Sequence, residues 1–496
     1  MNKRIRRRIF FAISAFLYLT ISQHTALTVL AAPDYAAEAE ERKQLPVQSN
    51  QIVNWPDGPK VSAQSAVLLE AETGTILYAK NIHERAYPAS TTKLMTCLIA
   101  AENAGTKETV RFSHDAVFGI ERDSSNIGID AGEAMPLEEC LYGIMVASAN
   151  EVANAVAEHV GGSMDAFAEM MNQKAAELGC ENTHFVNAHG LYDDNHYTTA
   201  YDLALIGRAF FENELLSKVG NTASYHFKAT PTQPDDFIAR NKHKLITGEI
   251  ACEGIRGGKT GYTDEARQTL VTCAERNGMK LICVVMKEES PDQFNDTVKL
   301  MDYGFANFAV TNIYENEEHY QVQDTHSFHT AYDIFGNSEG TFSLNKNSFV
   351  ILPKTLHFTD LSSEITYEGV SGDEVARIDY SYLNNYLGSA TIHLLPEAVA
   401  DSAKDTATFT KMPIGEFVTT ADGKQIIFIN VIRVILFTLL AGTVLIVLFL
   451  IRDLVTNYTI LDSAHGKSRK KRPRRRKRNR DKGPVFPSSR FNDFGL

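Results

Sequence analysis

An unbroken apolar stretch near the end of this 496-residue chain limits what the chain can fold into. Residues 434–451 are all apolar or small, and a helix of about 20 such residues crosses the hydrocarbon core of a bilayer. Within lipid, a helix satisfies its own backbone hydrogen bonds, so a single span needs no neighbouring element. The sequence therefore predicts a transmembrane helix at 434–451 and confines the larger folded domains to the residues before it.

Positive charge beside this stretch predicts the orientation of the span. Arg433 and Arg452 flank it, and residues 466–483 read GKSRKKRPRRRKRNRDKG. Because Lys and Arg next to a span mark the cytoplasmic side, we expect a cytoplasmic tail at 452–496 and an extracytoplasmic body. A nucleic-acid role is the competing interpretation of such a run, but the neighbouring span favours binding to anionic lipid head groups.

The N-terminus has the layout of a secretory signal peptide. Lys and Arg cluster at residues 3–8, an apolar run follows at 9–21, and the small residues Ala31 and Ala32 come after it. This pattern predicts a signal peptide over residues 1–32. An uncleaved membrane anchor is the alternative, which the shortness of the apolar run disfavours.

Charge and cysteine content exclude several classes of protein. The chain carries 49 Lys and Arg against 61 Asp and Glu, and both ends are basic, so its middle is strongly acidic. We therefore expect no nucleic acid as a partner of the body. The 6 cysteines show neither CxxC nor zinc spacing, which predicts buried free thiols, with one or more disulfides as the alternative. The sequence also lacks metal-binding motifs and a phosphate-binding glycine loop, so we expect no metal and no cofactor.

Hydrophobic patterning divides the body into domains. Residues 33–60 are polar and aperiodic, which predicts a flexible leader, with Trp55 as a surface or packing aromatic. Residues 61–308 contain short strands, a block of helices, then strands and a helix, which predicts an α+β domain. Residues 315–410 contain short alternating runs such as SFVILP and ARIDYSYL, which predict a small β-rich domain. A stalk at 411–433 would lead to the membrane.

Local signals place the elements of the α+β domain. Strands are predicted at Ala66–Glu70 and Thr75–Ala79, and Asn277–Gly278 between two apolar runs predicts a tight hairpin. Apolar residues at helical spacing predict a helix from Ser90 or Thr91 to about Ala101. Further helices are predicted at Leu137–Ala147, Glu151–Val160, Met164–Leu178 and Thr199–Phe211, and a closing helix begins at Ser290 or Asp292.

A serine and a lysine one helical turn apart suggest acyl-transfer chemistry. In YPASTTKLMT, Ser90 lies three residues before Lys93 at a helix start. Such side chains share a helix face, and a desolvated lysine can lose its proton near neutral pH and then take the proton of the hydroxyl. The pattern alone is weak, because Ser343–Lys346 and Ser468–Lys471 also match it and most such pairs are solvated helix faces.

Two more motifs strengthen this interpretation. VASANEVANA contains Ser148 and Asn150, and RGGKTGYTDEA contains Lys259–Gly261 just before strand residues. The set S-x-x-K, S-x-N and K-T-G is that of penicillin-recognising serine acyl transferases. With LLEAETGTILYAKN and FVNAHGLYDDNHYTTAYDLA, the chain resembles serine-type D-alanyl-D-alanine carboxypeptidases over about residues 60–410. These are the low-molecular-mass penicillin-binding proteins of the peptidase S11 family.

The resemblance implies a fold and a reaction. The fold is a penicillin-recognising serine transpeptidase/β-lactamase-like domain, in which an antiparallel sheet packs against a helical cluster, followed by a small β-rich pedestal. The reaction removes the terminal D-alanine from peptidoglycan stem peptides that end in D-Ala-D-Ala, and β-lactam antibiotics act as covalent inhibitors. A serine β-lactamase-like hydrolase and a non-catalytic penicillin-binding sensor are the alternatives.

The resemblance also implies roles for the motif residues. Ser90 would be the nucleophile and Lys93 its general base, with Asn150 holding Lys93 and the substrate amide. Ser148 and Lys259 would pass a proton to the departing D-alanine. The motif has alanine between its serine and asparagine, where the family often has glycine, and we expect this change to be tolerated.

Substrate-binding roles fall on the K-T-G strand and on a nearby basic stretch. Thr260 and the positive charge of Lys259, in the K-T-G motif that ends at Gly261, would receive the substrate carboxylate. The backbone N–H groups of Ser90 and Tyr262 would bind the oxyanion. An additional cation for the carboxylate is expected within RNKHKL. Lys244 matches that position best and Arg240 less well.

Four other polar residues have weaker implied roles. The pair Ser124–Ser125 resembles the polar edge of the family's substrate groove. His189 and His196 look like parts of the family's structural loop, which makes a general-base role for either histidine the less favoured interpretation.

Overall fold

The computed structural model describes residues 34–121, 123–318, 342–367, 372, 374–394, 418–419 and 425–426. The predicted signal peptide, transmembrane helix and basic tail lie outside these residues. Within the described part of the chain, no helix combines the length and apolar character that a membrane crossing requires. The chain forms two compact units, Met1–Leu395 and Pro396–Leu496. The second contributes one short strand pair, β16 (Val418–Thr419) and β17 (Gln425–Ile426), within the predicted stalk.

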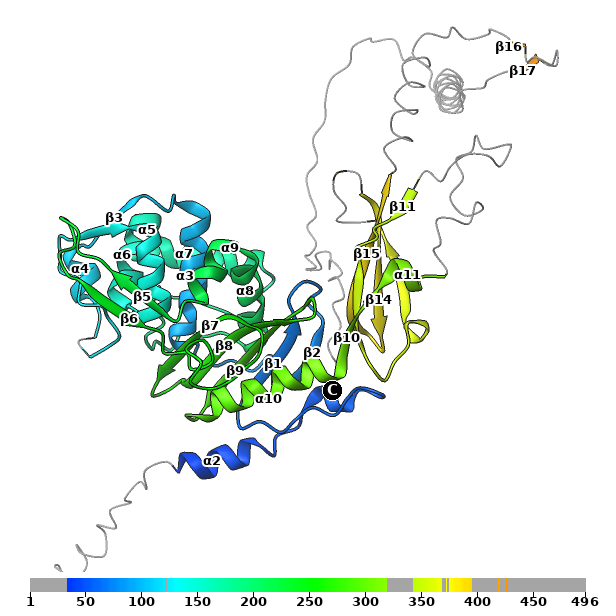
Figure 1. Cartoon of the computed structure of the whole chain (residues 1–496), viewed down its shortest axis with the longest axis horizontal. Coiled ribbons are helices and arrows are strands. Elements are labelled where there is room, and N and C mark those ends of the chain that lie inside the picture. Colours follow the sequence, from blue (N-terminus) through cyan, green and yellow to red (C-terminus); the bar gives the residue numbers. More distant parts are fainter. Residues whose placement is uncertain are drawn as a thin grey trace, which may run out of the picture. The chain divides into compact units, whose positions relative to one another are not determined.

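A five-stranded antiparallel sheet forms the centre of the α+β domain (Figure 1), with the strand order β2-β1-β9-β8-β7. Its strands are β1 (Ser65–Glu70), β2 (Ile76–Lys80), β7 (Ile255–Thr263), β8 (Arg267–Arg276) and β9 (Met279–Glu288). The predicted hairpin between β8 and β9 is confirmed. Asn277 and Gly278 have φ angles of 51° and 78°, as expected for the turn that matches the twist of paired strands.

The sheet separates two hydrophobic cores. Successive residues of β1 point to opposite faces, so Val67 and Leu69 join the core under the helical cluster while Ala66 and Leu68 join the core with α10. The helices on the first side are α3 (Lys93–Asn103), α4 (His114–Phe118), α5 (Leu137–Tyr142), α6 (Asn150–Gly161), α7 (Met164–Glu177), α8 (Ala200–Glu212) and α9 (Glu214–Gly220). The closing helix α10 spans Asp292–Asn307. Two short strand pairs complete the domain: β3 (Thr109–Arg111) with β4 (Ala134–Pro136), and β5 (Ser224–Phe227) with β6 (Phe237–Arg240).

One predicted helix changes form before it ends. The segment predicted as a helix over Leu137–Ala147 is α-helical only to Tyr142 and continues as a π-helical turn at Gly143–Ala147. The chain leaves this turn through Ser148, whose φ of 63° and ψ of 34° lie in the left-handed region. That region is uncommon for a residue with a β-carbon and often marks a functional position. Hydrophobic spacing does not reveal this change, because every residue from Cys140 to Val146 is buried.

The leader, predicted as flexible, is instead folded onto the domain. Residues Tyr35–Arg42 form helix α2, and Trp55 is buried, with its indole N–H donating to the carbonyl of Leu77 at 2.9 Å. Arg42 is also buried, although its segment is polar. Its carbonyl oxygen accepts a hydrogen bond from the buried Nζ of Lys80 at 2.7 Å. Polar contacts with distant strands therefore order a segment that has no hydrophobic periodicity.

The β-rich domain contains a six-stranded antiparallel sheet, as its alternating pattern predicts. The main strand order is β10-β12-β15-β14-β13, with β11 paired to β15. The strands are β10 (Phe308–Asn312), β11 (Phe342–Leu344), β12 (Phe349–Pro353), β13 (Ser362–Thr366), β14 (Glu374–Tyr382) and β15 (Asn385–Leu394), and a short helix α11 (Ile313–Asn316) follows β10. Because β10 directly follows α10, this sheet begins at Phe308 and not at residue 315.

Candidate active site

The first motif lies where the chain turns into helix α3. Ala89–Thr92 form a 3₁₀ turn, and α3 begins at Lys93. Ser90 is partly exposed, whereas Lys93 is fully buried one turn later. The Nζ of Lys93 lies 3.0 Å from the Oγ of Ser90. Ser90 is therefore accessible in part, while the amine of Lys93 behind it is shielded from water.

Lys93 is held by two further acceptors. Its Nζ donates to the Oδ1 of Asn150 at 2.6 Å and to the carbonyl of His189 at 2.7 Å. Burial, and secondly the nearby charge of Lys259, hold the pKa of Lys93 well below its usual range. A neutral amine has a free lone pair, so Lys93 can accept the proton of the Ser90 hydroxyl.

The second and third motifs meet beside this pair. The buried Nζ of Lys259, on β7, lies 3.0 Å from the Oγ of Ser148 and donates to the carbonyl of Thr260 at 2.7 Å. Burial, together with the charge of Lys242, lowers the pKa of Lys259 to about 7. Ser148, in its left-handed conformation, lies between the π-helical turn and α6, and Asn150 is the first residue of α6. The side chains of Ser148 and Asn150 therefore both project from this junction.

Strand β7 runs directly against the nucleophile turn. A β-carbon on Gly261 would lie 3.0 Å from the backbone nitrogen of Ser90 and 2.9 Å from the carbonyl oxygen of Pro88. Only glycine lets the strand come this close to the turn. Thr260 is partly buried, and Tyr262 is 48% exposed. Residues 260–262 therefore form the edge of the sheet beside Ser90.

The two lysines of RNKHKL lie in different surroundings, and the role predicted for Lys244 stays a prediction. The Nζ of Lys244 lies 5.9 Å from the ring centroid of Phe294, a residue of the core on the other face of the sheet, because the chain turns at His243. Lys242 instead donates to the Oγ of Ser125 at 2.7 Å. Its charge also lowers the pKa of Lys259. The other candidate, Arg240, is exposed on β6.

The loop that carries Ser125 is tied to the second motif. The carbonyl of Ser125 accepts a hydrogen bond from the backbone nitrogen of Asn150 at 2.8 Å. The buried carboxylate of Glu151 accepts one from the backbone nitrogen of Ile127 at 2.6 Å. Burial raises the pKa of Glu151. Glu151 is not among the residues predicted for the site, although its position directly after Asn150 was a usable signal.

The two loop histidines make structural contacts. The Nε2 of His196 lies 2.8 Å from the Oγ1 of Thr92, and the Nδ1 of His189 accepts from the backbone nitrogen of Leu191 at 3.1 Å. Burial lowers the pKa of each histidine to about 3, so both are neutral at physiological pH. The cysteines are all free thiols, and the described residues contain no cluster of His, Cys, Asp and Glu suited to a metal ion.

Known proteins resemble this chain in sequence and in fold. A family model described as D-alanyl-D-alanine carboxypeptidase, peptidase S11, matches residues 52–290. The D-alanyl-D-alanine carboxypeptidase DacF of Bacillus subtilis is 36% identical over 274 residues, which are 53% of this chain and 68% of the relative. DacA of Escherichia coli K12 is 33% identical over 267 residues, 52% of this chain and 64% of the relative. The chain thus spans about two thirds of the length of both relatives.

A solved structure shows the shared fold. Penicillin-binding protein 5 from Haemophilus influenzae matches with a TM-score of 0.54 at 24% identity, over 68% of this chain and 98% of that chain. The domain has the penicillin-binding serine transpeptidase-like α+β fold, as predicted. The identity to DacF, with the matching family model, shows that the chain belongs to the peptidase S11 family of serine-type D-alanyl-D-alanine carboxypeptidases.

Proposed function

We propose that the chain is a membrane-anchored D-Ala-D-Ala carboxypeptidase that removes the terminal D-alanine from peptidoglycan stem peptides through an acyl-enzyme on Ser90. One observation carries this proposal: the Nζ of Lys93 is buried, bonded to Asn150, and 3.0 Å from the Oγ of the solvent-accessible Ser90. Family membership supports the substrate class.

Acylation begins with transfer of the Ser90 proton to neutral Lys93. The Oγ of Ser90 then bonds to the carbonyl carbon between the two D-alanines, and the carbonyl oxygen becomes an oxyanion. The backbone N–H groups of Ser90 and Tyr262 receive that negative charge, and removal of one such donor typically costs about 10²–10³ in rate. The close approach of β7 at Gly261 supports this assignment, because it brings the strand beside the nitrogen of Ser90.

Collapse of the intermediate breaks the C–N bond and releases D-alanine. The leaving nitrogen takes a proton through Ser148, which hydrogen-bonds to Lys259, and Lys93 supplies the proton that it took from Ser90. The charges of Lys259 and Lys242, with the hydroxyl of Thr260, hold the substrate carboxylate. Water then attacks the ester, Lys93 again acts as base, and the shortened peptide leaves.

The same chemistry accounts for β-lactams as covalent inhibitors. When Ser90 opens the lactam ring, the product is an ester of Ser90. The amine released from the ring stays covalently attached to the acyl group, so this amine obstructs the water that would hydrolyse the ester. The apolar run at 434–451 and the basic tail support a single-pass anchor with an extracytoplasmic catalytic domain and a cytoplasmic tail near anionic lipids.

The direct test is D-alanine release from a peptide ending in D-Ala-D-Ala by the full chain in detergent. The wild type should release one D-alanine per peptide, and Ser90→Ala should not. Ser363→Ala is the control, because Ser363 is exposed on β13 of the β-rich domain. Release by Ser90→Ala at the wild-type rate would refute the acyl-enzyme.

A further inference from the structure

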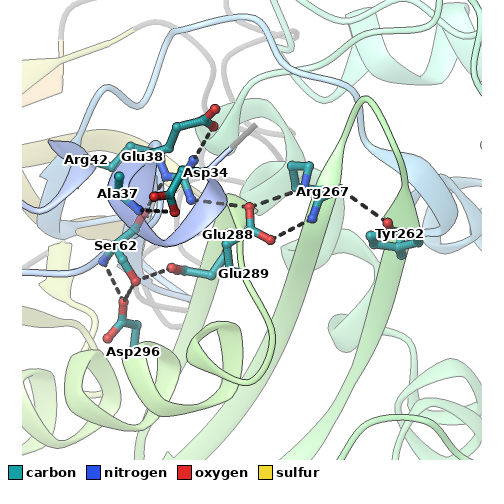
Figure 2. Close-up of polar contacts among 10 residues, drawn as sticks. All are labelled: Asp34, Ala37, Glu38, Arg42, Ser62, Tyr262, Arg267, Glu288, Glu289 and Asp296. Carbon is teal, nitrogen blue, oxygen red and sulfur yellow. Dashed lines mark hydrogen bonds and ion pairs between the residues drawn. The ribbon is translucent and has the colours of Figure 1, made fainter. Parts of the chain in front are cut away.

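Helix α2 of the leader contacts the hairpin that carries the K-T-G motif. The ring of Tyr35, the first residue of α2, has its centroid 3.8 Å from the Cζ of Arg267, the first residue of β8. Figure 2 shows that the Arg267 guanidinium also reaches Tyr262, and the Nη1 of Arg267 donates to the Tyr262 hydroxyl at 3.2 Å. One guanidinium therefore joins the leader to the strand edge beside Ser90.

A shared carboxylate holds this guanidinium in place (Figure 2). Glu289 accepts from the Nε of Arg267 at 3.2 Å and from its Nη2 at 2.8 Å, and its Oε1 lies 3.5 Å from the Nη2 of Arg42 in α2. A two-bond contact between guanidinium and carboxylate fixes both distance and orientation. The side chains of Arg42, Glu289 and Arg267 are only 6%, 18% and 15% exposed, so solvent screens the network weakly.

Helix α2 is itself fixed to the domain at its other end. The Nε of Arg42 donates to the carbonyl of Ser62 at 2.9 Å, and the carbonyl of Arg42 accepts from Lys80. Tyr35 is thus presented to Arg267 by a helix whose C-terminal end cannot move freely.

The Arg267–Tyr262 contact is not explained by a need to satisfy buried groups. Tyr262 is 48% exposed, and its hydroxyl already donates to the Oδ1 of Asp264 at 2.8 Å. Arg267 also has a φ of 54°, a left-handed conformation that is costly for a residue with a β-carbon. Such a conformation persists where neighbouring residues stabilise it. At Arg267 these neighbours are the ring of Tyr35 and the carboxylate of Glu289.

We propose that Arg267 is a positioning residue that transmits the docking of helix α2 to the Tyr262 segment, and thereby sets the oxyanion-binding edge against Ser90. The inference rests on the proposed function, because it assigns the backbone of Tyr262 to the oxyanion. Loss of the Tyr35 ring should leave the fold intact and let the tip of the β7–β8 hairpin shift. Small displacements of this kind lower the rate of the chemical step more than they weaken substrate binding.

The experiment compares Tyr35→Ala, Tyr35→Phe and Glu38→Ala in the full chain. For each variant, kcat and KM for D-alanine release are measured per penicillin-titrated active site, so an unfolded fraction does not lower the apparent kcat. Tyr35→Ala should lose roughly 10-fold in kcat with little change in KM. Tyr35→Phe keeps the ring over the guanidinium and should restore the wild-type kcat. Glu38→Ala removes only an exposed partner of Arg42 and should match the wild type.

Two results would overturn the positioning role while leaving the proposed function intact. The first is a kcat of Tyr35→Ala that equals the wild-type kcat. The second is an equal loss of kcat in Tyr35→Ala and Tyr35→Phe. If the wild-type chain itself released no D-alanine and bound no penicillin, the proposed function would fall and the positioning role would fall with it.

Discussion

The α-carbon of Gly261 faces the backbone nitrogen of Ser90 so closely that a β-carbon on Gly261 would lie 3.0 Å from that nitrogen. The hydroxyl of Thr269 reinforces the approach, since it donates to the carbonyl of Pro88 at 2.9 Å and joins β8 to the nucleophile turn. The sheet edge and the turn are therefore one packed unit, and in the proposed mechanism the distance between them determines whether the oxyanion fits.

Gly261→Ala should impair acylation without abolishing folding. The added methyl would lie 2.3 Å from the Oγ1 of Thr269, so the strand must move away from Ser90. We expect the rate constant for acylation by a fluorescent penicillin to fall about 10²-fold. Gly105→Ala is the matched control, because its methyl would meet only the flexible end of Glu108 at 3.2 Å. Wild-type acylation by Gly261→Ala would mean that this contact does not shape the site.

The pH dependence of kcat/KM should reflect two buried amines that act in different protonation states. Lys93 must be neutral to act as base, so its depressed pKa allows activity at neutral pH. Lys259 must be charged to hold the carboxylate, and its pKa is about 7. Measured kcat/KM should therefore fall as pH rises through this value. In Lys259→Arg, whose guanidinium stays charged, activity should be lower but the fall above neutral pH should disappear. A decline with the same midpoint in both proteins would exclude Lys259 as its cause.

Lys242 and Lys244 form a natural pair of test and control. Lys242 is bonded to Ser125 next to the site, whereas Lys244 packs near Phe294. Lys242→Ala should raise KM for D-Ala-D-Ala peptides roughly 5- to 20-fold, since an ion pair to a carboxylate contributes about 1–2 kcal/mol. Lys244→Ala should leave KM unchanged. The opposite ranking of the two variants would restore the assignment made from sequence.

Lys80→Met should loosen the leader. The Nζ of Lys80 donates to the carbonyls of Arg42 and Val61 at 2.7 and 2.8 Å, and burial lowers its pKa to about 8. Removing the amine leaves two buried acceptors unsatisfied, so the free energy of unfolding should drop by about 2–4 kcal/mol in urea titrations. Lys60→Met, at an exposed lysine bonded to Gln44, should change it by less than about 0.5 kcal/mol. Equal stability of both variants would show that this anchor is dispensable.

Local signals predicted the elements whose causes are local. The turn at Asn277–Gly278 needs only positive φ angles, and helices α6 to α8 need only apolar spacing and caps, such as the Ser163 side chain that accepts from the nitrogen of Ala166. The spacing of Ser90 and Lys93 likewise follows from one helical turn. These features were therefore readable from the sequence.

Features set by distant contacts were not readable. The leader is ordered by Lys80 and by Glu289, which is 247 residues away from Arg42. The sequence does not distinguish Lys242 from Lys244, because both are lysines in the same basic stretch. The turn at His243 separates the directions of their side chains. Ser148, which is left-handed, comes directly after a π-helical turn. Apolar spacing cannot distinguish that turn from a regular helix.

The most direct measurement is peptide mass spectrometry of the full chain after brief exposure to penicillin. The chemistry proposed for Ser90 and Lys93 predicts a single penicilloyl adduct on the peptide that contains Ser90, and a large loss of adduct in Lys93→Met although Ser90 remains. An adduct on another residue, or undiminished labelling of Lys93→Met, would contradict the assignment of Ser90 as a nucleophile activated by Lys93.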